Sequence, residues 1–306
     1  TSFVLWDGNH LNLLKKGLRN LYILFKDIFS LICMESAYRA YLKGQEDMKK
    51  KAKLILKYND GKQWLNTTST RQYSIRKDDV NGAEYYWPNI DVFSFNHQIK
   101  TVKPVIDEVN RFVKNKGTVL QAGGNCGVYT LAYSKIYKNV YTFEPDMTNM
   151  TCLTLNTDCR NNIIKFQACL GETHGMTAIQ NPLEIKDTGS IHVKTPNEID
   201  DDMLVVESRP NIPILKIDDI KFTELDLIHL DIEGYEFYAL KGGIETIKKF
   251  KPVIVLEVCE DGHSEKYGYT RADMETFLDM IEYKFVKQLD ANNDNVYIHR
   301  SLLVPP

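Results

Sequence analysis

A short apolar run that ends in a glycine-rich turn constrains this chain more than any other stretch. Residues 118–121 are predicted to form a strand, and Gly123, Gly124 and Gly127 follow directly. Residues 128–137 then have the composition of a helix. A strand, a tight glycine turn and a helix bring bare backbone close to a nucleotide-like ligand. The stretch therefore predicts an α/β fold that binds such a ligand at the turn.

A second apolar run supports this interpretation. It covers residues 139–143 and ends at Glu144, 17 positions after Gly127. In such folds an acidic side chain at the tip of the second strand accepts hydrogen bonds from ribose hydroxyls. We therefore expect Glu144 to bind a ribose; the alternative is an acid in a solvated loop.

Strands and helices alternate through the rest of the chain. Apolar strands separated by helices indicate a mainly parallel sheet with both faces covered. Residues 171–213 are predicted to be a long irregular stretch, and the chain closes with a predicted antiparallel hairpin at 283–299. The other predicted strands cover residues 118–121, 140–143, 163–169, 225–230 and 253–258, and the predicted helices cover 99–114, 128–137, 148–160, 235–250 and 271–282.

The N-terminal third has a different character. Residues 1–60 are predicted to form a helical extension, 61–98 a short β-rich connecting segment, and 99–306 the main domain. Within residues 11–32, apolar side chains recur at steps of three and four, which places them on one face of a helix. This face packs on the chain's own domain, forms a helix–helix seam in a homo-oligomer or with a partner, or lies on a membrane surface. The sequence leaves these alternatives open.

An aromatic cluster lies in the connecting segment. Residues 73–76 and 84–87 are predicted strands around a hairpin-type turn, and the second carries Tyr85, Tyr86 and Trp87. Such a cluster either packs into a core or forms a platform on which a sugar or base stacks.

Four motifs occur in the order and spacing of one protein family. They lie at residues 120–127, 143–145, 230–236 followed by 240–243, and 251–257. On these motifs the stretch from 117 to 299 resembles the FkbM family of S-adenosylmethionine-dependent methyltransferases. The resemblance implies a Rossmann-like, seven-stranded class I methyltransferase sheet with a terminal antiparallel hairpin. It also implies S-adenosylmethionine as cofactor and methyl transfer to a hydroxyl of a sugar, glycan or related small molecule.

The resemblance assigns roles to residues of these motifs. Gly123 and Gly127 let the backbone approach the amino-acid end of the cofactor, where Asn125 can form a hydrogen bond. Glu144 accepts from the ribose, and the adenine is expected beside Ala168 because of its place in the fold. The candidate cofactor-binding residues are Gln121, Gly123, Gly124, Asn125, Gly127, Glu144, Ala168 and Asp231.

Two positions depart from the family pattern. The loop usually opens with Asp where this chain has Gln121, whose amide oxygen accepts hydrogen bonds but carries no charge. The family usually has Lys two residues before Asp231, where this chain has His229. Neither change removes the glycine turn or Glu144, so we expect the cofactor to bind.

Acidic residues at two strand ends are the candidate catalytic groups. Asp231 and Glu233 follow the fourth strand at the ligand-binding edge of the sheet, where two carboxylates can orient an acceptor hydroxyl and take its proton. The alternatives are a metal-ligand set, or Glu233 acting at a helix N-terminus. Glu257 ends a buried strand and is either a site residue or half of a buried structural pair. His263 is a candidate base or an exposed loop histidine.

The net charge of −3 argues against a dedicated nucleic-acid binder, which usually carries a basic face. An RNA 2′-O-methyltransferase stays as an alternative. It would usually require a Lys-Asp-Lys-Glu set, for which Lys216 and Asp231 are present, but His229 and the acids within residues 198–202 argue against it. A third alternative is a non-catalytic cofactor-binding module that assembles with a partner through its N-terminal helix.

The six cysteines are scattered, and none forms a Cys-x-x-Cys pair or a zinc-ligand pattern with His. This usage is typical of buried thiols in a reducing compartment. No signal peptide is visible, and no run reaches the ~18 apolar residues of a membrane span. We therefore predict a cytoplasmic location and no bound metal.

Overall fold

The computed structural model of the chain describes residues 72–79, 81–181, 187–194, 207–257, 264–292 and 294–303. The chain divides between residues 69 and 70, and all described residues belong to the second unit. The predicted helical extension, including residues 11–32 and their alternative roles, lies outside the described residues. Within the described ranges, no helix is both long and apolar enough to cross a membrane.

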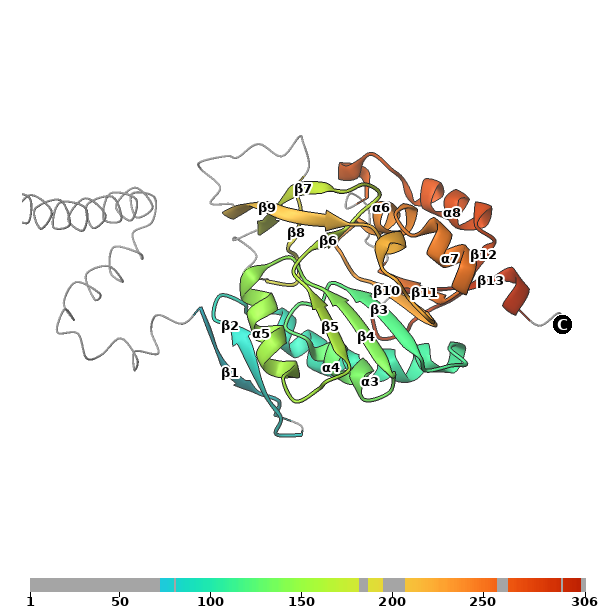
Figure 1. Cartoon of the computed structure of the whole chain (residues 1–306). Helices are drawn as coiled ribbons and strands as arrows, with labels where there is room; N and C mark the ends of the chain where they lie inside the picture. The colour runs from blue at the N-terminus through green and yellow to red at the C-terminus, as the bar shows by residue number, and fades with distance from the viewer. Residues whose placement is uncertain are drawn as a thin grey trace, which may run out of the picture. The chain divides into compact units, whose positions relative to one another are not determined.

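Seven strands form the central sheet: β3 (Thr118–Ala122), β4 (Asn139–Phe143), β5 (Ile163–Phe166), β10 (Leu227–Leu230), β11 (Val253–Leu256), β12 (Tyr283–Gln288) and β13 (Asn295–His299). Their order is β12–β13–β11–β10–β3–β4–β5 (Figure 1). The strands from β11 to β5 are parallel, whereas β12 and β13 form an antiparallel hairpin that joins the sheet through β11. This confirms the predicted Rossmann-like sheet with its terminal hairpin.

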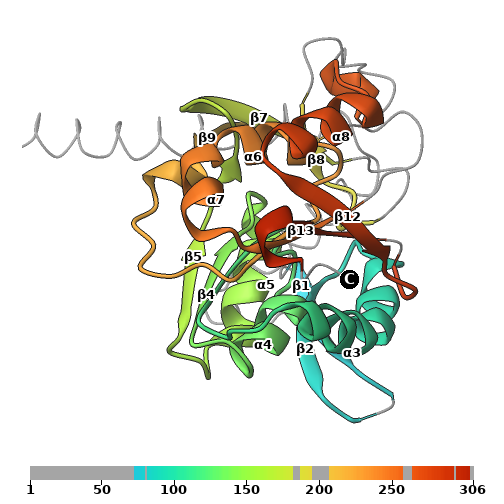
Figure 2. The ribbon, with the colours of Figure 1, turned by 90° about the vertical axis from the view of Figure 1, so that its right-hand side faces the viewer.

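Helices cover both faces of this sheet (Figures 1 and 2). They are α3 (Ser94–Phe112), α4 (Val128–Ser134) and α5 (Met147–Thr157) on one face, and α6 (Glu236–Lys241), α7 (Ile244–Phe250) and α8 (Arg271–Met280) on the other. Alternate residues of a strand serve the two faces. Val119 belongs to a buried cluster with Val105 of α3 and Tyr133 of α4, whereas Leu120 belongs to a cluster with Leu240 of α6. Burial on both faces explains why these strands are apolar throughout.

A second sheet occupies the stretch that was predicted to be irregular. It consists of β6 (Cys169–Leu170), β7 (Gly175–Asn181), β8 (His192–Val193) and β9 (Glu207–Leu215), in the order β6–β9–β7–β8. Where the structure describes residues 171–213, it contains strands, so the prediction of an irregular stretch was wrong there. Few apolar residues of this sheet are buried, among them Ile179, Val193 and Ile212. Its strands therefore lack the continuous apolar runs that mark the central strands.

The described part of the chain begins with the predicted hairpin, β1 (Tyr73–Lys77) and β2 (Glu84–Pro88). β2 packs against α5, where the backbone N–H of Tyr86 donates to Asn156 Oδ1 (2.7 Å) and Asn156 Nδ2 donates back to Tyr86 O (2.9 Å). Trp87 is fully buried, with its ring centroid 5.0 Å from that of Phe95. Trp87 is thus part of the core and offers no stacking platform.

Candidate active site

A cavity of about 610 Å³ opens at the carboxyl ends of the central strands. β3, β4, β10 and β11 all end at this edge, where ligands bind in open α/β sheets. We divide the cavity into two halves by their lining residues. The glycine-loop half is lined by Gly123, Asn125, Phe143, Glu144, Asn149, Ala168, Cys169 and Leu170, and the carboxylate half by Ser94, His97, Gln98, Tyr129, Asp187, Ser190, His192, Asp231, Glu233, Glu257, Asn292 and Asp294.

Gly123 brings the glycine loop into contact with the neighbouring strand end. Its backbone has φ +83°, and a Cβ added there would lie 1.8 Å from the backbone oxygen of Asp231. The backbone N–H groups of Gly123 and Gly124 both donate to the carbonyl of Phe143, over 3.1 and 2.9 Å. Only glycine fits at position 123, so the loop presents bare backbone to the cavity.

Gln121 lies beneath the loop and does not line the cavity. Its side chain is almost fully buried, and its Oε1 accepts from the hydroxyls of Thr130 (2.9 Å) and Thr142 (2.8 Å). Its Nε2 donates to the carbonyl of Gly123 (2.8 Å). An amide supplies both the acceptor and the donor that this position uses, which a carboxylate cannot do. Gln121, which stands where the family usually has Asp, therefore supports the loop from below through its hydrogen bonds.

Asn125 connects the loop to the opposite wall of the cavity. Its Nδ2 donates to the backbone carbonyl of Thr188 (3.2 Å), and its Oδ1 accepts from the backbone N–H of Cys126 (2.6 Å). Asn149 Nδ2 donates to the same Thr188 carbonyl (3.0 Å). The Thr188 hydroxyl donates to Asp91 Oδ2 (3.0 Å). The Asn125 side chain is thus engaged within the chain.

Glu144 is the buried acid of the glycine-loop half. Its Oε2 accepts from the backbone N–H of Asn125 (2.7 Å) and its Oε1 from that of Asp146 (2.8 Å). Burial, with the charge of Asp146 second, raises the pKa of Glu144 to about 8, against the lowering effect of these hydrogen bonds. Each carboxylate oxygen has a second lone pair, so Glu144 can accept further hydrogen bonds from a ligand.

The wall beyond Glu144 is apolar. The cavity is lined there by four buried residues: Phe143, Ala168, Cys169 and Leu170. This is the position where the fold was expected to hold an adenine, and a flat apolar wall suits an aromatic ring.

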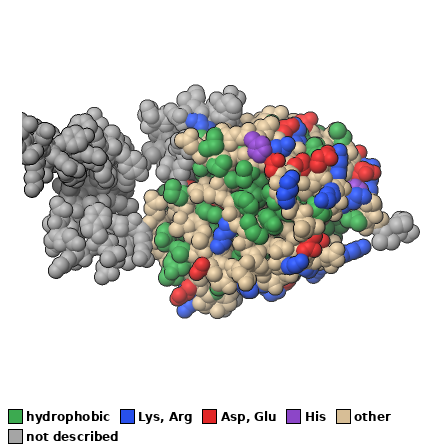
Figure 3. All heavy atoms as spheres, in the orientation of Figure 1, with side chains coloured by type: hydrophobic (Ala, Val, Ile, Leu, Met, Phe, Trp, Pro, Cys, Tyr) green, Lys and Arg blue, Asp and Glu red, His purple; other side chains and the backbone are tan. Residues whose placement is uncertain are grey.

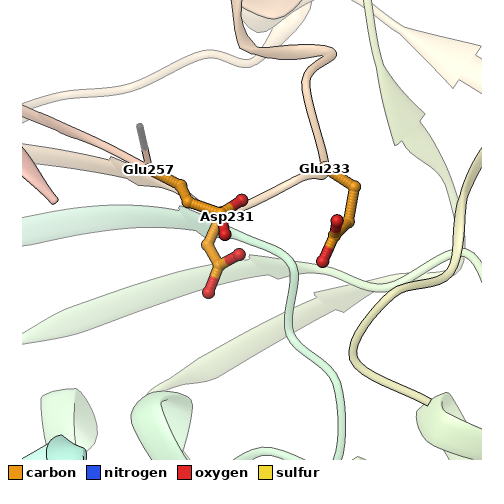
Figure 4. Close-up of side chains that lie close together, drawn as sticks. All are labelled: Asp231, Glu233 and Glu257. Atoms are coloured by element: carbon orange, nitrogen blue, oxygen red, sulfur yellow. The ribbon is translucent and has the colours of Figure 1, made fainter. Parts of the chain in front are cut away.

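Three acidic side chains meet in the carboxylate half (Figure 4). Asp231 directly follows β10, Glu257 directly follows the neighbouring β11, and Glu233 lies in the next loop with φ +58°. One carboxylate oxygen from each lies within 4.8 Å of the others. Parallel strands end at the same edge of a sheet, which explains why Asp231 and Glu257 meet. Oxygens at this spacing can share a proton, hydrogen-bond a hydroxyl or bind a cation.

The Asp231 side chain is exposed to the open cavity, and protein atoms pack densely around its other sides. Its pKa is raised well above its ordinary value, first by this desolvation and then by the charge of Glu257. Asp294 and Glu233 add to the effect. The raised pKa favours the uptake of a proton by Asp231.

Glu236 shapes the loop that carries Glu233. It is almost fully buried, and its Oε1 accepts from the backbone N–H groups of Ile232 (2.9 Å) and Gly234 (3.4 Å). Burial raises the pKa of Glu236 to about 8. The acid in the first turn of α6 is Glu236. Glu233 precedes that turn, so it is not the N-terminal acid of this helix.

His229 is buried behind the carboxylate half. Its Nδ1 lies 2.7 Å from the Tyr133 hydroxyl, and its Nε2 lies 3.0 Å from Asp294 Oδ2. If Tyr133 donates to Nδ1, then the Nε2–H group donates to Asp294. Asn292 also donates to Asp294, which lines the cavity. His229 therefore positions a cavity carboxylate from within the core.

The structure brings most of the predicted residues together. Gly123, Asn125, Glu144, Ala168, Asp231, Glu233 and Glu257 line one cavity, whereas Gln121, Gly124 and Gly127 do not. His263 lies outside the described residues. Asp187 and Asp294 also line the cavity, and the sequence offered no signal for them, because both follow or lie within irregular, polar segments.

The seven-stranded sheet with its terminal hairpin is the fold expected of a class I methyltransferase domain. The sequence profile of the methyltransferase FkbM domain matches residues 121–290, and the chain belongs to this family. S-adenosylmethionine is the expected cofactor. A comparison with curated proteins gives no match.

Three solved structures that resemble this chain are distant from it in sequence. Methyltransferase FkbM from Methylobacillus flagellatus is 16% identical, with 67% of this chain and 55% of that chain covered and a TM-score of 0.39. This chain thus spans about half of that relative. TYW2 from M. jannaschii, in complex with AdoMet, is 16% identical, with 75% and 88% covered and a TM-score of 0.37. Magnesium protoporphyrin IX methyltransferase from Synechocystis, with bound SAM, is 10% identical, with 66% and 79% covered and a TM-score of 0.38.

The glycine-loop half fits this cofactor. Position 123 has no room for a side chain, so the backbone there can approach the ligand. Glu144 can accept from ribose hydroxyls, and residues 168–170 offer an apolar wall for the adenine. When bound, S-adenosylmethionine supplies an electrophilic methyl group.

Proposed function

We propose that this chain transfers a methyl group from S-adenosylmethionine to a hydroxyl of a sugar, glycan or related small molecule. The observation that carries the proposal is the continuity of one cavity, which joins the glycine loop to three carboxylates at neighbouring strand ends. Methyl transfer requires an acceptor aligned with the methyl group and, for a hydroxyl, a group that takes its proton. In this proposal the glycine-loop half holds the cofactor, and the carboxylate half orients the acceptor and takes its proton.

Asp231 is the base of this proposal. It lies at the junction of the two halves, because its backbone contacts Gly123 and its side chain faces the carboxylate half. Its raised pKa suits a group that accepts a proton during transfer. Glu233 and Glu257 lie close enough to hydrogen-bond the same acceptor and orient it.

Uncharged polar groups complete the carboxylate half. Several of its lining side chains can donate or accept hydrogen bonds: Ser94, Gln98, Tyr129, Ser190 and Asn292. Such a set suits an acceptor with several hydroxyls. On the face shown in Figure 3, acidic and basic side chains intermix over α6, α7 and α8, with no basic stripe there to bind RNA.

The proposal is tested by calorimetry with S-adenosylmethionine, followed by transfer of a radioactive methyl group to a panel of neutral glycans and to capped RNA. We expect binding, and transfer to glycans only. Transfer to RNA alone would replace the proposed acceptor with a nucleic acid. Binding without transfer to either would favour the non-catalytic assembly module.

Asp231→Asn separates chemistry from fold in this assay. Loss of the base should lower the transfer rate roughly a hundredfold or more. Glu245→Gln, which makes the same charge change at an exposed site of α7, should leave the rate unchanged. Equal rates for Asp231→Asn and the native chain would remove Asp231 from the role of base. The cytoplasmic location and a partner contact through residues 11–32 stay predictions from sequence.

A further inference from the structure

The charges around the cavity have one sign. Six of its lining side chains are carboxylates: Glu144, Asp187, Asp231, Glu233, Glu257 and Asp294. None of the lining residues that the structure describes is Lys or Arg, and His97 and His192 are the only imidazoles among them. Lys241, in the last turn of α6, pairs with Glu172 (2.8 Å).

These carboxylates reach the cavity from separate parts of the fold. Glu144 follows β4, Asp231 follows β10, Glu257 follows β11, and Asp294 precedes β13. The partners that the structure gives them include N–H groups, such as those of Asn125 to Glu144 and Asn292 to Asp294. Hydrogen bonds from uncharged amides stabilise a carboxylate without cancelling its charge. Burial raises the pKa of Glu144 and Asp231, and a cation that enters the cavity favours the ionised form of such groups, so their negative charge develops when a cation binds.

The cluster also lies beside the cofactor loop. The backbone of Asp231 contacts Gly123, while the Asp231 side chain meets Glu233 and Glu257 within 4.8 Å. These carboxylates therefore lie next to the part of the cavity that would hold S-adenosylmethionine. S-adenosylmethionine carries a positive sulfonium in its centre, and its product, S-adenosylhomocysteine, is neutral there.

We propose that these carboxylates make the cavity selective for positive charge, so that it holds S-adenosylmethionine more tightly than the neutral product and rejects acceptors that carry a phosphate, sulfate or carboxylate. In a site with low effective dielectric, a unit charge interacts strongly with carboxylates a few ångströms away. Loss of the sulfonium charge during transfer then promotes release of the product. The part that concerns the acceptor rests on the proposed function, whereas the part that concerns the cofactor does not.

Calorimetry on the native chain tests the cofactor part without any acceptor. We expect S-adenosylmethionine to bind about tenfold more tightly than S-adenosylhomocysteine, and sinefungin, which carries an ammonium in place of the sulfonium, to bind as the cation does. In Glu257→Gln the ratio should fall toward one, mainly because the cations bind less tightly. Binding of S-adenosylhomocysteine at its native affinity shows that the variant is folded. Glu245→Gln should keep the native ratio.

Matched acceptors test the second part. Methyl glucoside, glucose 6-phosphate and glucuronic acid share a ring and differ in charge. We expect transfer to the neutral member only, and measurable transfer to the anions in Glu233→Gln.

The outcomes separate the claims. Equal or tighter binding of S-adenosylhomocysteine by the native chain overturns the cofactor part, and native transfer to the anionic acceptors overturns the acceptor part. Transfer to no acceptor, with the preference for the cation intact, contradicts the proposed function and supports the charge selectivity of the cavity.

Discussion

The glycine-loop half of the cavity comes from one continuous region, residues 121–170, whereas the carboxylate half is assembled from segments far apart in the chain. Residues 121–144 contribute the loop, its support and the buried acid of the first half. The second half is formed by residues 94–98, 187–193 and 292–294, together with the acids that follow β10 and β11. The loop and buried acid of the first half therefore follow from a local motif, and the second half depends on how distant segments fold together.

The polar groups of the two halves are also satisfied differently. In the glycine-loop half, Gln121 and Asn125 are bonded within the chain, so the loop is ordered before a ligand arrives. In the carboxylate half, Asp231 and Glu257 face each other, and each charge disfavours the other. The first half is pre-organised by the chain, while the second gains most from what binds to it.

The largest expected effect is that of Gly123→Ala. The added Cβ would lie 1.8 Å from the backbone oxygen of Asp231, in a left-handed conformation. We expect a loss of roughly 3 kcal/mol or more in the free energy of unfolding, and no cofactor binding. Urea denaturation and calorimetry measure both. Gly175→Ala is the matched control, because nothing lies within 4 Å of the added Cβ. Equal stability of the two variants would contradict the contact between the halves.

Glu144→Ala should follow in size. It removes the carboxylate expected to accept from two ribose hydroxyls, which costs about 3 kcal/mol, or roughly a hundredfold in affinity for S-adenosylmethionine. Calorimetry at constant pH gives the affinity. Glu245→Ala on the surface of α7 is the control. Native affinity in Glu144→Ala would show that the ribose is held elsewhere.

The pH dependence of stability compares two buried acids: Glu144 of the glycine-loop half, and Glu236, which supports the loop that carries Glu233. Burial raises the pKa of Glu144 and of Glu236 to about 8 in the folded chain, from 4.5. Between these values the folded chain binds more protons than the unfolded chain, so the free energy of unfolding falls as pH rises. The slope is about 1.4 kcal/mol per pH unit for one group. Stability without ligand, measured from about pH 5 to pH 8, should fall less in Glu144→Gln and in Glu236→Gln. An unchanged slope in both variants would rule these acids out as its source.

The smallest expected effect is that of Thr188→Val. It removes the hydroxyl that donates to Asp91 over 3.0 Å and keeps the carbonyl that accepts from Asn125 and Asn149. We expect a loss of about 1 kcal/mol in the free energy of unfolding and little change in cofactor affinity. Thr151→Val, whose hydroxyl donates to the Met147 carbonyl at an exposed site, should lose less. Urea denaturation of both variants measures these losses. An equal or larger loss in Thr151→Val would contradict the prediction.

Sequence patterns predicted what depends on neighbouring residues. The strand before Gly123, the acid Glu144 at the next strand end and the terminal hairpin all follow from local periodicity and turn residues. The order of four motifs was enough to indicate the family. The meeting of Asp231 with Glu257 was within reach, because both end neighbouring parallel strands.

Contacts between distant, irregular segments were beyond these patterns. Asp294 lies in a hairpin turn that indicates only a turn, and its contact with His229 depends on how β13 aligns with β11. Thr188 lies in a stretch without periodicity, and its two amide partners are fixed by tertiary packing. Gln121 was expected to face the cofactor, but the alternation of β3 turns it toward Thr130 and Thr142.

Gly123 and the backbone of Asp231 are in contact, so main-chain atoms alone fix the distance between the two halves of the cavity. Side chains of the carboxylate half can therefore be exchanged without changing the distance between the two halves. Under the proposed function, this separates two properties in redesign: substitutions at positions 233 and 257 change the charges beside the acceptor, while the backbone keeps the two halves aligned.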